Sequence, residues 1–329
     1  MKTLKNPALG NTIPIIGLIV VLSAFAGTIA PGFIAAGNLL NLLRLAVPLG
    51  IICAGQTAAI LSGGVDLSVG SVAILTNVVA ADIMQGRNAN NPEAFAACLI
   101  VAAAIGAING SAVAWVGINP FVMTLAMSIV VQGAALVYSG GIAGGSASPL
   151  VKTMGVGVFH GIPIPVLIWL FLAAATLFIL HFTTFGRRLY AVGANRKTAR
   201  LSGVNVPWTL MRVYILSSVF AMAAGLVVTG NIGVGTLEWG FDYRLVSMAA
   251  VVMGGTSFSG GQGGYAGSFV SAIALTLLNS LLTIVRVSEP VRQMIYGAVI
   301  LISLWLSSGA VGPRPRYWGA TPPSPPKTR

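Results

Sequence analysis

Long apolar stretches, separated by short polar ones, follow each other along almost the whole chain. A helix that crosses the hydrocarbon core of a bilayer needs about 20 mostly apolar residues. Ten stretches approach or reach that length, at residues 12–30, 45–62, 67–85, 95–117, 120–138, 163–182, 212–231, 245–259, 266–285 and 292–308. This pattern predicts an all-α protein, a polytopic transmembrane helical bundle of about ten spans.

The largest polar and basic interval inside this pattern covers residues 183–212. Asn195 is a favourable N-cap and Gly203 is favourable just after a helix C-terminus, so residues 196–202 are predicted to form a helix of about two turns. Pro207 suits the first turn of the helix that follows. A short basic helix held between two spans has the form of a docking element.

The distribution of charge favours one orientation of the chain. Cytoplasmic loops of membrane proteins carry an excess of Lys and Arg. With a cytoplasmic N-terminus and a crossing at each stretch, most of the 18 Lys and Arg fall on the cytoplasmic side. Arg196, Lys197 and Arg200 are among them, on or near one face of the short helix. Both termini and residues 183–212 are therefore predicted to be cytoplasmic.

Composition supports the same class of protein and argues against others. The chain is 56% hydrophobic and 7% charged, whereas soluble domains carry about 25% charged residues. The net charge of +12 would suit nucleic-acid binding, but the bases lie in loops where the orientation rule already explains them. Six acids and two histidines leave little for hydrolytic or metal chemistry, so no catalytic or metal site is expected. Cys53 and Cys98 fall in apolar runs and are predicted to be buried thiols.

The chain divides into one large domain with two short ends. Residues 1–11 are predicted to be a cytoplasmic N-terminus and residues 12–308 a transmembrane domain with a cytoplasmic loop at 183–211. Residues 309–329 are rich in proline and are expected to be a disordered cytoplasmic tail. Two lysines before the first apolar run also fit a signal peptide. We favour a retained span, because the charge pattern is consistent with it.

A glycine-rich run precedes the third apolar stretch and reads Ser62-Gly63-Gly64-Val65-Asp66-Leu67-Ser68-Val69-Gly70-Ser71. Its glycines favour a tight turn, and the Asp66 carboxylate is expected to cap the next helix at the positive end of the helix dipole. This run also closely resembles the signature of the inner-membrane permeases of ribose-type sugar ABC importers. The signature residues are Gly63, Gly64, Asp66, Ser68 and Gly70. Residues 119–141, 185–204 and 251–261 resemble further segments of that family, in the same order.

The resemblance implies a role for the loop and a set of partners. In that family the loop docks a cytoplasmic ABC ATPase, the permease pairs with itself or with a sister chain, and a periplasmic binding protein delivers the sugar. The docking residues that it implies are Gly186, Arg187, Tyr190, Gly193, Asn195, Arg196, Lys197, Ala199, Arg200, Leu201, Ser202 and Gly203. It also implies a multi-pass transport subunit of the bacterial inner membrane that is no enzyme and needs no cofactor, since the partner uses the ATP. The chain itself has no G-x-x-x-x-G-K-[ST] phosphate loop.

Polar side chains inside the apolar stretches are candidates for a substrate path. They are Gln56, Asn77, Asn109, Asn119, Gln132 and Asn279, with Phe121 or Trp115 as a surface on which a sugar can stack. A sugar needs hydrogen bonds but no charged partner, which suits an interior that holds almost no charge. Each of these side chains is also explained by a bond to a neighbouring helix. Outside the membrane, Glu238, Asp242 and Arg244 are candidates for contact with the binding protein.

Two other classes of function remain as alternatives. An ion-coupled secondary transporter of a small polar solute would be expected to hold buried acids, whereas Asp66 and Asp82 fall at the ends of predicted spans. An intramembrane hydrolase would need a Ser–His or metal arrangement, but His160 and His181 lie in or beside loops with no recognisable partner. A permease subunit that translocates a monosaccharide is the function that we predict.

Overall fold

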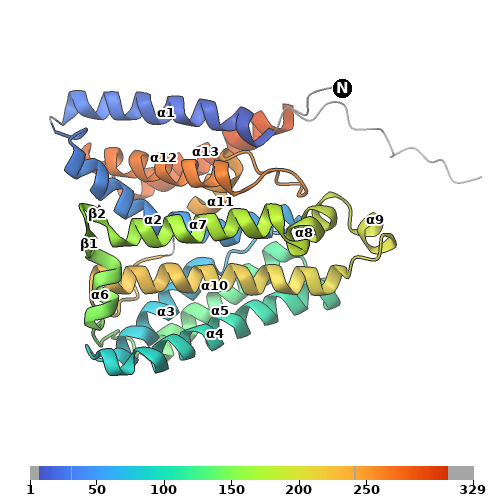
Figure 1. Cartoon of the computed structure of the whole chain (residues 1–329), viewed down its shortest axis with the longest axis horizontal. Coiled ribbons are helices and arrows are strands. Elements are labelled where there is room, and N and C mark those ends of the chain that lie inside the picture. The colour runs from blue at the N-terminus through green and yellow to red at the C-terminus, as the bar shows by residue number, and fades with distance from the viewer. Residues whose placement is uncertain (1–6, 31, 241, 310–329) are drawn as a thin grey trace, which may run out of the picture.

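The computed structural model describes residues 7–30, 32–240 and 242–309, and its long helices run side by side along one direction (Figure 1). Apart from a small hairpin of β1 (Val158–Phe159) and β2 (Ile162–Pro163), the regular structure of these residues is helical. The predicted all-α class is confirmed. The predictions for the proline-rich tail and for the first residues of the chain lie outside the described residues.

Six helical stretches are long and apolar enough to cross a membrane. They are α2 (Ala36–Leu61), α4 (Asn91–Ser111) with its flanking turns η1 (Asn88–Asn90) and η2 (Ala112–Val116), α5 (Pro120–Tyr138), α7 (Ile164–Phe182), α10 (Val206–Ile232) and α12 (Tyr265–Ile284). Each of them overlaps one of the stretches expected from the apolar pattern, although α2 begins nine residues before its stretch. The prediction of a polytopic helical protein is therefore confirmed.

The other four expected spans are also helical, but they are not among the six stretches that are both long and apolar enough to cross a membrane. They are α1 (Pro7–Ile29), α3 (Val69–Met84), α11 (Tyr243–Met253) and α13 (Glu289–Gly309). α3 and α11 have only 16 and 11 residues, fewer than the roughly 20 that a full crossing needs. α11 ends at Met253, well before the expected boundary at residue 259, because the chain turns at Gly254 and Gly255. The count of ten spans stays a prediction.

Three short helices lie at the two ends of the bundle. α6 (Pro149–Val156) and the β1–β2 hairpin lie at one end, and α8 (Thr184–Ala194) and α9 (Arg196–Leu201) lie at the other (Figure 1). The first residues of α1 lie toward the end that carries α8 and α9. This arrangement is consistent with the prediction that the N-terminus and the loop share one side.

α10 lies among α2, α3, α4 and α6, and small residues let these helices come close to it. A Cβ atom added at Gly55 of α2 would lie 2.7 Å from the Cα atom of Ser217, and one added at Gly106 of α4 would lie 2.6 Å from the Cα atom of Ile215. Close van der Waals packing drives helix association in lipid, where no hydrophobic difference separates helix from solvent. Gly55 and Gly106 therefore serve close packing of these helices.

A buried chain of hydrogen bonds joins α7, α12 and α2. The Trp169 indole N–H donates to the Tyr265 hydroxyl at 2.8 Å, and that hydroxyl donates to the Gly50 carbonyl oxygen at 2.7 Å. The Trp169 ring also stacks on Phe269, with the ring centroids 4.2 Å apart. Because all three polar groups are satisfied, these large aromatic side chains are buried between the helices without an unpaired donor.

Candidate functional site

Residues 183–211 form two helices, α8 and α9, between α7 and α10. The Asn195 side chain accepts a hydrogen bond from the backbone N–H of Thr198 at 3.0 Å and so caps α9. Gly203 follows α9 with a φ of +80°, a conformation that glycine adopts without strain. The predicted helix at 196–202 is confirmed within a residue, whereas α8 was not predicted.

α8 has one apolar face that the sequence could have revealed. Leu189 and Val192 are buried on that face, and Val192 packs in a small cluster with Ala199, Val206 and Leu210. Phe185, Leu189 and Val192 follow each other at spacings of four and three residues, which is the pattern of a half-buried helix. The polar character of the interval obscured this spacing. The cluster fastens α8 and α9 to the first turns of α10.

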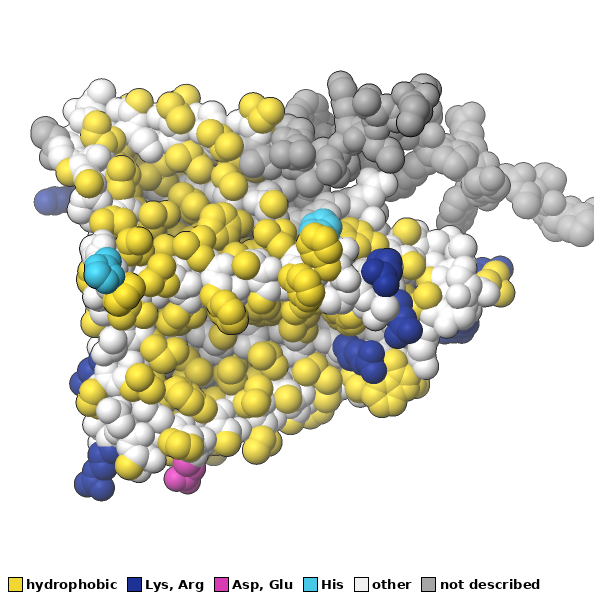
Figure 2. Space-filling model, in the orientation of Figure 1, with side chains coloured by type: hydrophobic (Ala, Val, Ile, Leu, Met, Phe, Trp, Pro, Cys, Tyr) yellow, Lys and Arg dark blue, Asp and Glu magenta, His cyan; other side chains and the backbone are white. Residues whose placement is uncertain are grey.

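Exposed bases cover the outer surface of the two helices. Arg187, Arg188, Arg196, Lys197 and Arg200 are all exposed. In the part of the chain that the structure describes, none of them forms an ion pair with an acid. Figure 2 shows dark blue side chains at both ends of the visible face and a largely apolar surface between them. The loop therefore presents a cationic surface that is open to an acidic partner.

α8 rests directly on two turns of the bundle. The backbone N–H of Gly261 donates to the carbonyl oxygen of Leu61, the last residue of α2, at 2.9 Å. Gly193 of α8 fits against both, since a Cβ atom there would lie 2.6 Å from the Gly261 nitrogen and collide with the Leu61 oxygen. Beside this contact the Tyr190 hydroxyl donates to the Gly263 carbonyl oxygen at 2.9 Å. We call the contact of Leu61, Gly193 and Gly261 the glycine junction.

The next turn of the chain, residues 62–68, holds Asp66 fully buried. The Asp66 carboxylate accepts from the Ser68 backbone N–H at 2.9 Å and from the Ser68 hydroxyl, which in turn accepts from the Asn109 amide at 3.0 Å. The expected cap of the following helix differs in detail. α3 begins at Val69, and Asp66 holds the turn two residues before its N-cap position. The carboxylate thus links the entry of α3 to α4.

Two side chains from distant helices fix the same turn. The Thr124 hydroxyl of α5 accepts from the Leu67 backbone N–H at 3.0 Å, and the Tyr214 hydroxyl of α10 donates to the Val65 carbonyl oxygen at 3.4 Å. Sequence reasoning did not single out either residue for this role. A lone tyrosine or threonine in an apolar run carries no pattern that identifies its partner. The turn therefore connects α3, α4, α5 and α10, and it directly follows the Leu61 end of the glycine junction in the chain.

The candidates for the substrate path divide into a buried and an exposed set. Gln56, Asn77 and Asn109 are buried. Asn77 is committed to the fold, because its amide donates to Thr229 at 3.0 Å and its oxygen accepts from the Thr236 N–H at 2.7 Å. Gln56 is buried with no hydrogen-bond partner for either end of its amide among the described residues. Of the three buried candidates, only Gln56 makes no side-chain hydrogen bond within the described residues.

Asn119, Phe121, Gln132 and Asn279 lie on the surface of the chain. Asn119 caps α5 by accepting from the Phe121 N–H at 2.9 Å, and Asn279 accepts from Arg292 at 3.4 Å. These residues belong to α5, its cap and α12, whereas the buried set belongs to α2, α3 and α4. The surface set can border a path only where another molecule covers these faces.

Arg244, expected at the outer surface, is turned inward at the start of α11. Its guanidinium donates to the Ser128 hydroxyl of α5 at 3.3 Å, and Ser128 bonds the Ser71 hydroxyl of α3 at 2.8 Å. Glu238 and Asp242, the two other residues expected there, are exposed. Arg244 therefore joins α11 to α5 and the buried helix α3.

Cys53 and Cys98 are free and buried, as predicted. In residues 7–30, 32–240 and 242–309, no group of three or more His, Cys, Asp or Glu side chains is placed to hold a metal ion.

Comparison with known proteins gives a consistent result. The family described as branched-chain amino acid transport system / permease component matches residues 38–304. The ribose import permease protein of Escherichia coli (strain K12) is 36% identical over 290 residues, which cover 87% of this chain and 90% of that protein. The ribose import permease protein of Bacillus subtilis (strain 168) is 35% identical over 304 residues, 89% and 91% of the two chains. The galactose/methyl galactoside import permease protein of Escherichia coli (strain K12) is 34% identical over 298 residues, 84% and 88%. No solved structure matches the chain.

Proposed function

The chain belongs to the family of branched-chain amino acid transport system permease components, and from this membership we propose that it is the transmembrane permease subunit of an ABC importer for a monosaccharide. The sugar class is inferred from the relatives that are named as ribose and galactose import permeases. The subunit resides in the bacterial inner membrane and crosses it several times. It carries no cofactor, because a separate cytoplasmic ATPase hydrolyses the ATP.

The observation that supports this proposal is the connection of a cationic loop to the interior of the bundle. The ATPase binds the exposed bases of α9, which include Arg196 and Lys197. When two ATPase subunits close on ATP, they move α8, and α8 presses through the glycine junction on the end of α2 and on the turn before α12. The adjoining turn with Asp66 then shifts the entry of α3. The ATPase thus biases two conformations of the bundle that already exist, as a ligand-driven switch requires.

In this proposal all ten predicted helices belong to the membrane domain and both termini are cytoplasmic. α3 and α11, too short to cross alone, are enclosed by the longer helices. A second permease chain, identical or related, covers the exposed face of α5 with Phe121 and Gln132, and the sugar passes between the two chains. A periplasmic sugar-binding protein delivers the sugar at the end of the bundle that carries α6.

The test is uptake into proteoliposomes that contain this chain together with its ATPase and its binding protein. We expect uptake of one labelled monosaccharide that requires ATP on the side of α9 and binding protein on the side of α6. Uptake by the chain alone, driven by a proton or sodium gradient and unaffected by ATP, would identify the alternative, an ion-coupled secondary transporter of a small polar solute.

A further inference from the structure

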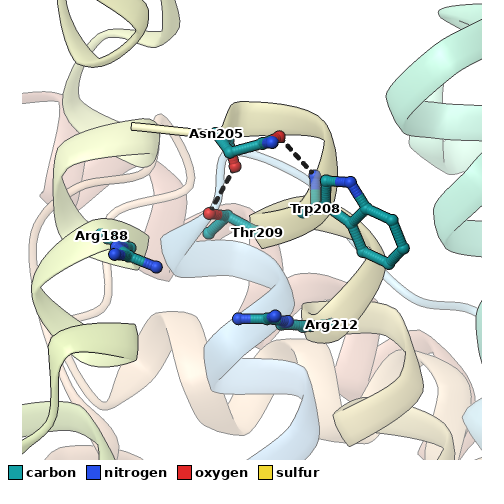
Figure 3. A pocket seen from close by; sticks show the side chains of 5 residues that line it. All are labelled: Arg188, Asn205, Trp208, Thr209 and Arg212. Atoms are coloured by element: carbon teal, nitrogen blue, oxygen red, sulfur yellow. Dashed lines mark hydrogen bonds between the residues drawn. The ribbon is translucent and has the colours of Figure 1, made fainter. Parts of the chain in front are cut away.

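Two arginines from different helices converge on a pocket of about 320 Å³ at the start of α10. Arg188 comes from α8 and Arg212 from α10, and Asn205, Trp208 and Thr209 complete the lining. Figure 3 shows the two guanidinium groups on opposite sides of the pocket, both directed into the space between the helices. The two exposed arginines thus face one cavity and not separate patches of solvent.

The pocket offers hydrogen-bond donors and positive charge. The Asn205 side-chain oxygen already accepts from the Trp208 N–H at 3.2 Å, and the Asn205 carbonyl accepts from the Thr209 hydroxyl at 2.8 Å. A guanidinium group donates through five N–H bonds and accepts none. Neither arginine pairs with an acid in the described residues. The ligand that fits is an anion with several acceptor oxygens, and phosphate matches arginine in a bidentate geometry.

Large aromatic side chains are exposed at the pocket and at the end of α7. Trp208 packs edge-on against Trp115 with the ring centroids 5.6 Å apart, and both indoles are about half exposed. Phe182, the last residue of α7, has 72% of its surface exposed. Figure 2 shows the dark blue cluster of this region directly beside the apolar surface of α7 and α10. Exposed tryptophans gather where a membrane meets water, which is the level that we expect for this pocket.

We propose that this pocket binds the phosphate of an anionic glycerophospholipid from the adjacent leaflet, with the acyl chains along the exposed apolar surface of α7 and α10. The phosphate of such a ligand bonds the two guanidinium groups, and its acyl chains cover the exposed aromatic side chains. A small soluble anion can do only the first. The bound lipid would join α8 to α10 across the gap that Arg188 and Arg212 face. The site is independent of which solute the protein carries.

The test compares lipid binding by the purified full-length chain and its variants in native mass spectrometry. Phosphatidylglycerol and phosphatidylcholine with identical acyl chains are titrated separately. We expect phosphatidylglycerol to bind about 10- to 30-fold more tightly, as two basic side chains near a membrane surface would give. The variant R188Q/R212Q should lose this preference, whereas R187Q, which removes an exposed charge one residue away but outside the pocket, should keep it. Equal preference in R188Q/R212Q and the native chain overturns the proposal.

Competition experiments distinguish a lipid phosphate from a soluble anion as the ligand of the pocket. Inorganic phosphate and glycerol 3-phosphate at millimolar concentration are not expected to displace phosphatidylglycerol. Full displacement by either would assign the pocket to a soluble anion and overturn the lipid proposal. An acidic protein partner is the other possible occupant. Loss of ATPase binding in R188Q/R212Q with unchanged lipid preference would assign the pocket to that partner. If R188Q/R212Q does not fold, R188K/R212K keeps the charge, loses the bidentate geometry and should show a reduced preference.

Discussion

The Tyr190 hydroxyl lies 2.9 Å from the Gly263 carbonyl oxygen and joins α8 to the turn that precedes α12. Burial raises the pKa of Tyr190 above its ordinary value, so the hydroxyl stays protonated and donates this bond throughout the neutral pH range. The glycine junction lies beside it and adds close backbone packing to the same contact. If α8 moves and this turn does not, a partly buried hydrogen bond must therefore break.

The substitution Tyr190→Phe is expected to weaken the coupling between ATP hydrolysis and transport. It removes one hydrogen bond worth about 1 kcal/mol and leaves the Gly263 carbonyl oxygen without it, while the ring still packs. The exposed bases of α9 are unchanged, so the ATPase should still bind and hydrolyse ATP. The measurement is the ratio of sugar transported to ATP hydrolysed in proteoliposomes, which should fall several-fold.

The matched control for this prediction is Tyr138→Phe. The Tyr138 hydroxyl donates to Asp82 at 2.7 Å between the ends of α5 and α3, away from the loop. This variant should keep the native ratio of transport to hydrolysis. An unchanged ratio in Tyr190→Phe would show that the contact with Gly263 does not transmit the movement of α8.

Two glycines in helices predict opposite effects of one substitution on stability. Gly106→Ala places a Cβ atom 2.6 Å from the Ile215 Cα atom of α10, so two backbones must separate, at a cost of about 1–3 kcal/mol. Gly133→Ala in α5 meets no atom within 4 Å and gains up to about 1 kcal/mol of helix propensity. Thermal unfolding in detergent should therefore show a lower Tm for Gly106→Ala and an equal or higher Tm for Gly133→Ala. The reverse order would contradict the packing of α4 against α10.

The substitutions Asp66→Asn and Asp66→Ala separate hydrogen bonding from charge in the buried turn. Asparagine keeps an oxygen that can accept from the Ser68 N–H, whereas alanine leaves both that N–H and the Ser68 hydroxyl without this acceptor. An unsatisfied buried group costs about 1–3 kcal/mol. We expect Asp66→Ala to lower the Tm more than Asp66→Asn. Equal losses would show that the negative charge, and not the hydrogen bonds, matters in this turn.

Local features explain what the sequence could predict. The extent of an apolar stretch is local, so all six long spans were found, although α2 begins nine residues and α10 six residues before the expected start. The cap Asn195 with Gly203 located α9. The same pattern misjudged α11, because apolar residues continue past Met253 while the chain turns at Gly254. It also missed α8, whose buried residues Leu189 and Val192 lie between two arginines and the basic helix α9.

Contacts between distant segments explain what it could not predict. The sequence predicted a tight turn at the glycines before Asp66 and a helix cap at Asp66, but the residues that hold this turn belong to other helices. The Tyr214 hydroxyl reaches Val65 over 149 positions, and Tyr190 reaches Gly263 over 73. No local pattern encodes such pairs. The inward turn of Arg244 toward Ser128, over 116 positions, was missed for the same reason.

The last prediction concerns the orientation of the loop, on which the coupling mechanism depends. Because both native cysteines are buried, a cysteine introduced at an exposed position is the one that a membrane-impermeant maleimide should label. Lys197→Cys places it on α9 and Lys152→Cys places it on α6, at opposite ends of the bundle (Figure 1). With a cytoplasmic loop, intact cells or spheroplasts should label only Lys152→Cys, and inverted vesicles only Lys197→Cys. The native chain is the control for background labelling. If Lys197→Cys is labelled from outside, no cytoplasmic ATPase can reach α9, and the proposed coupling through the glycine junction is wrong.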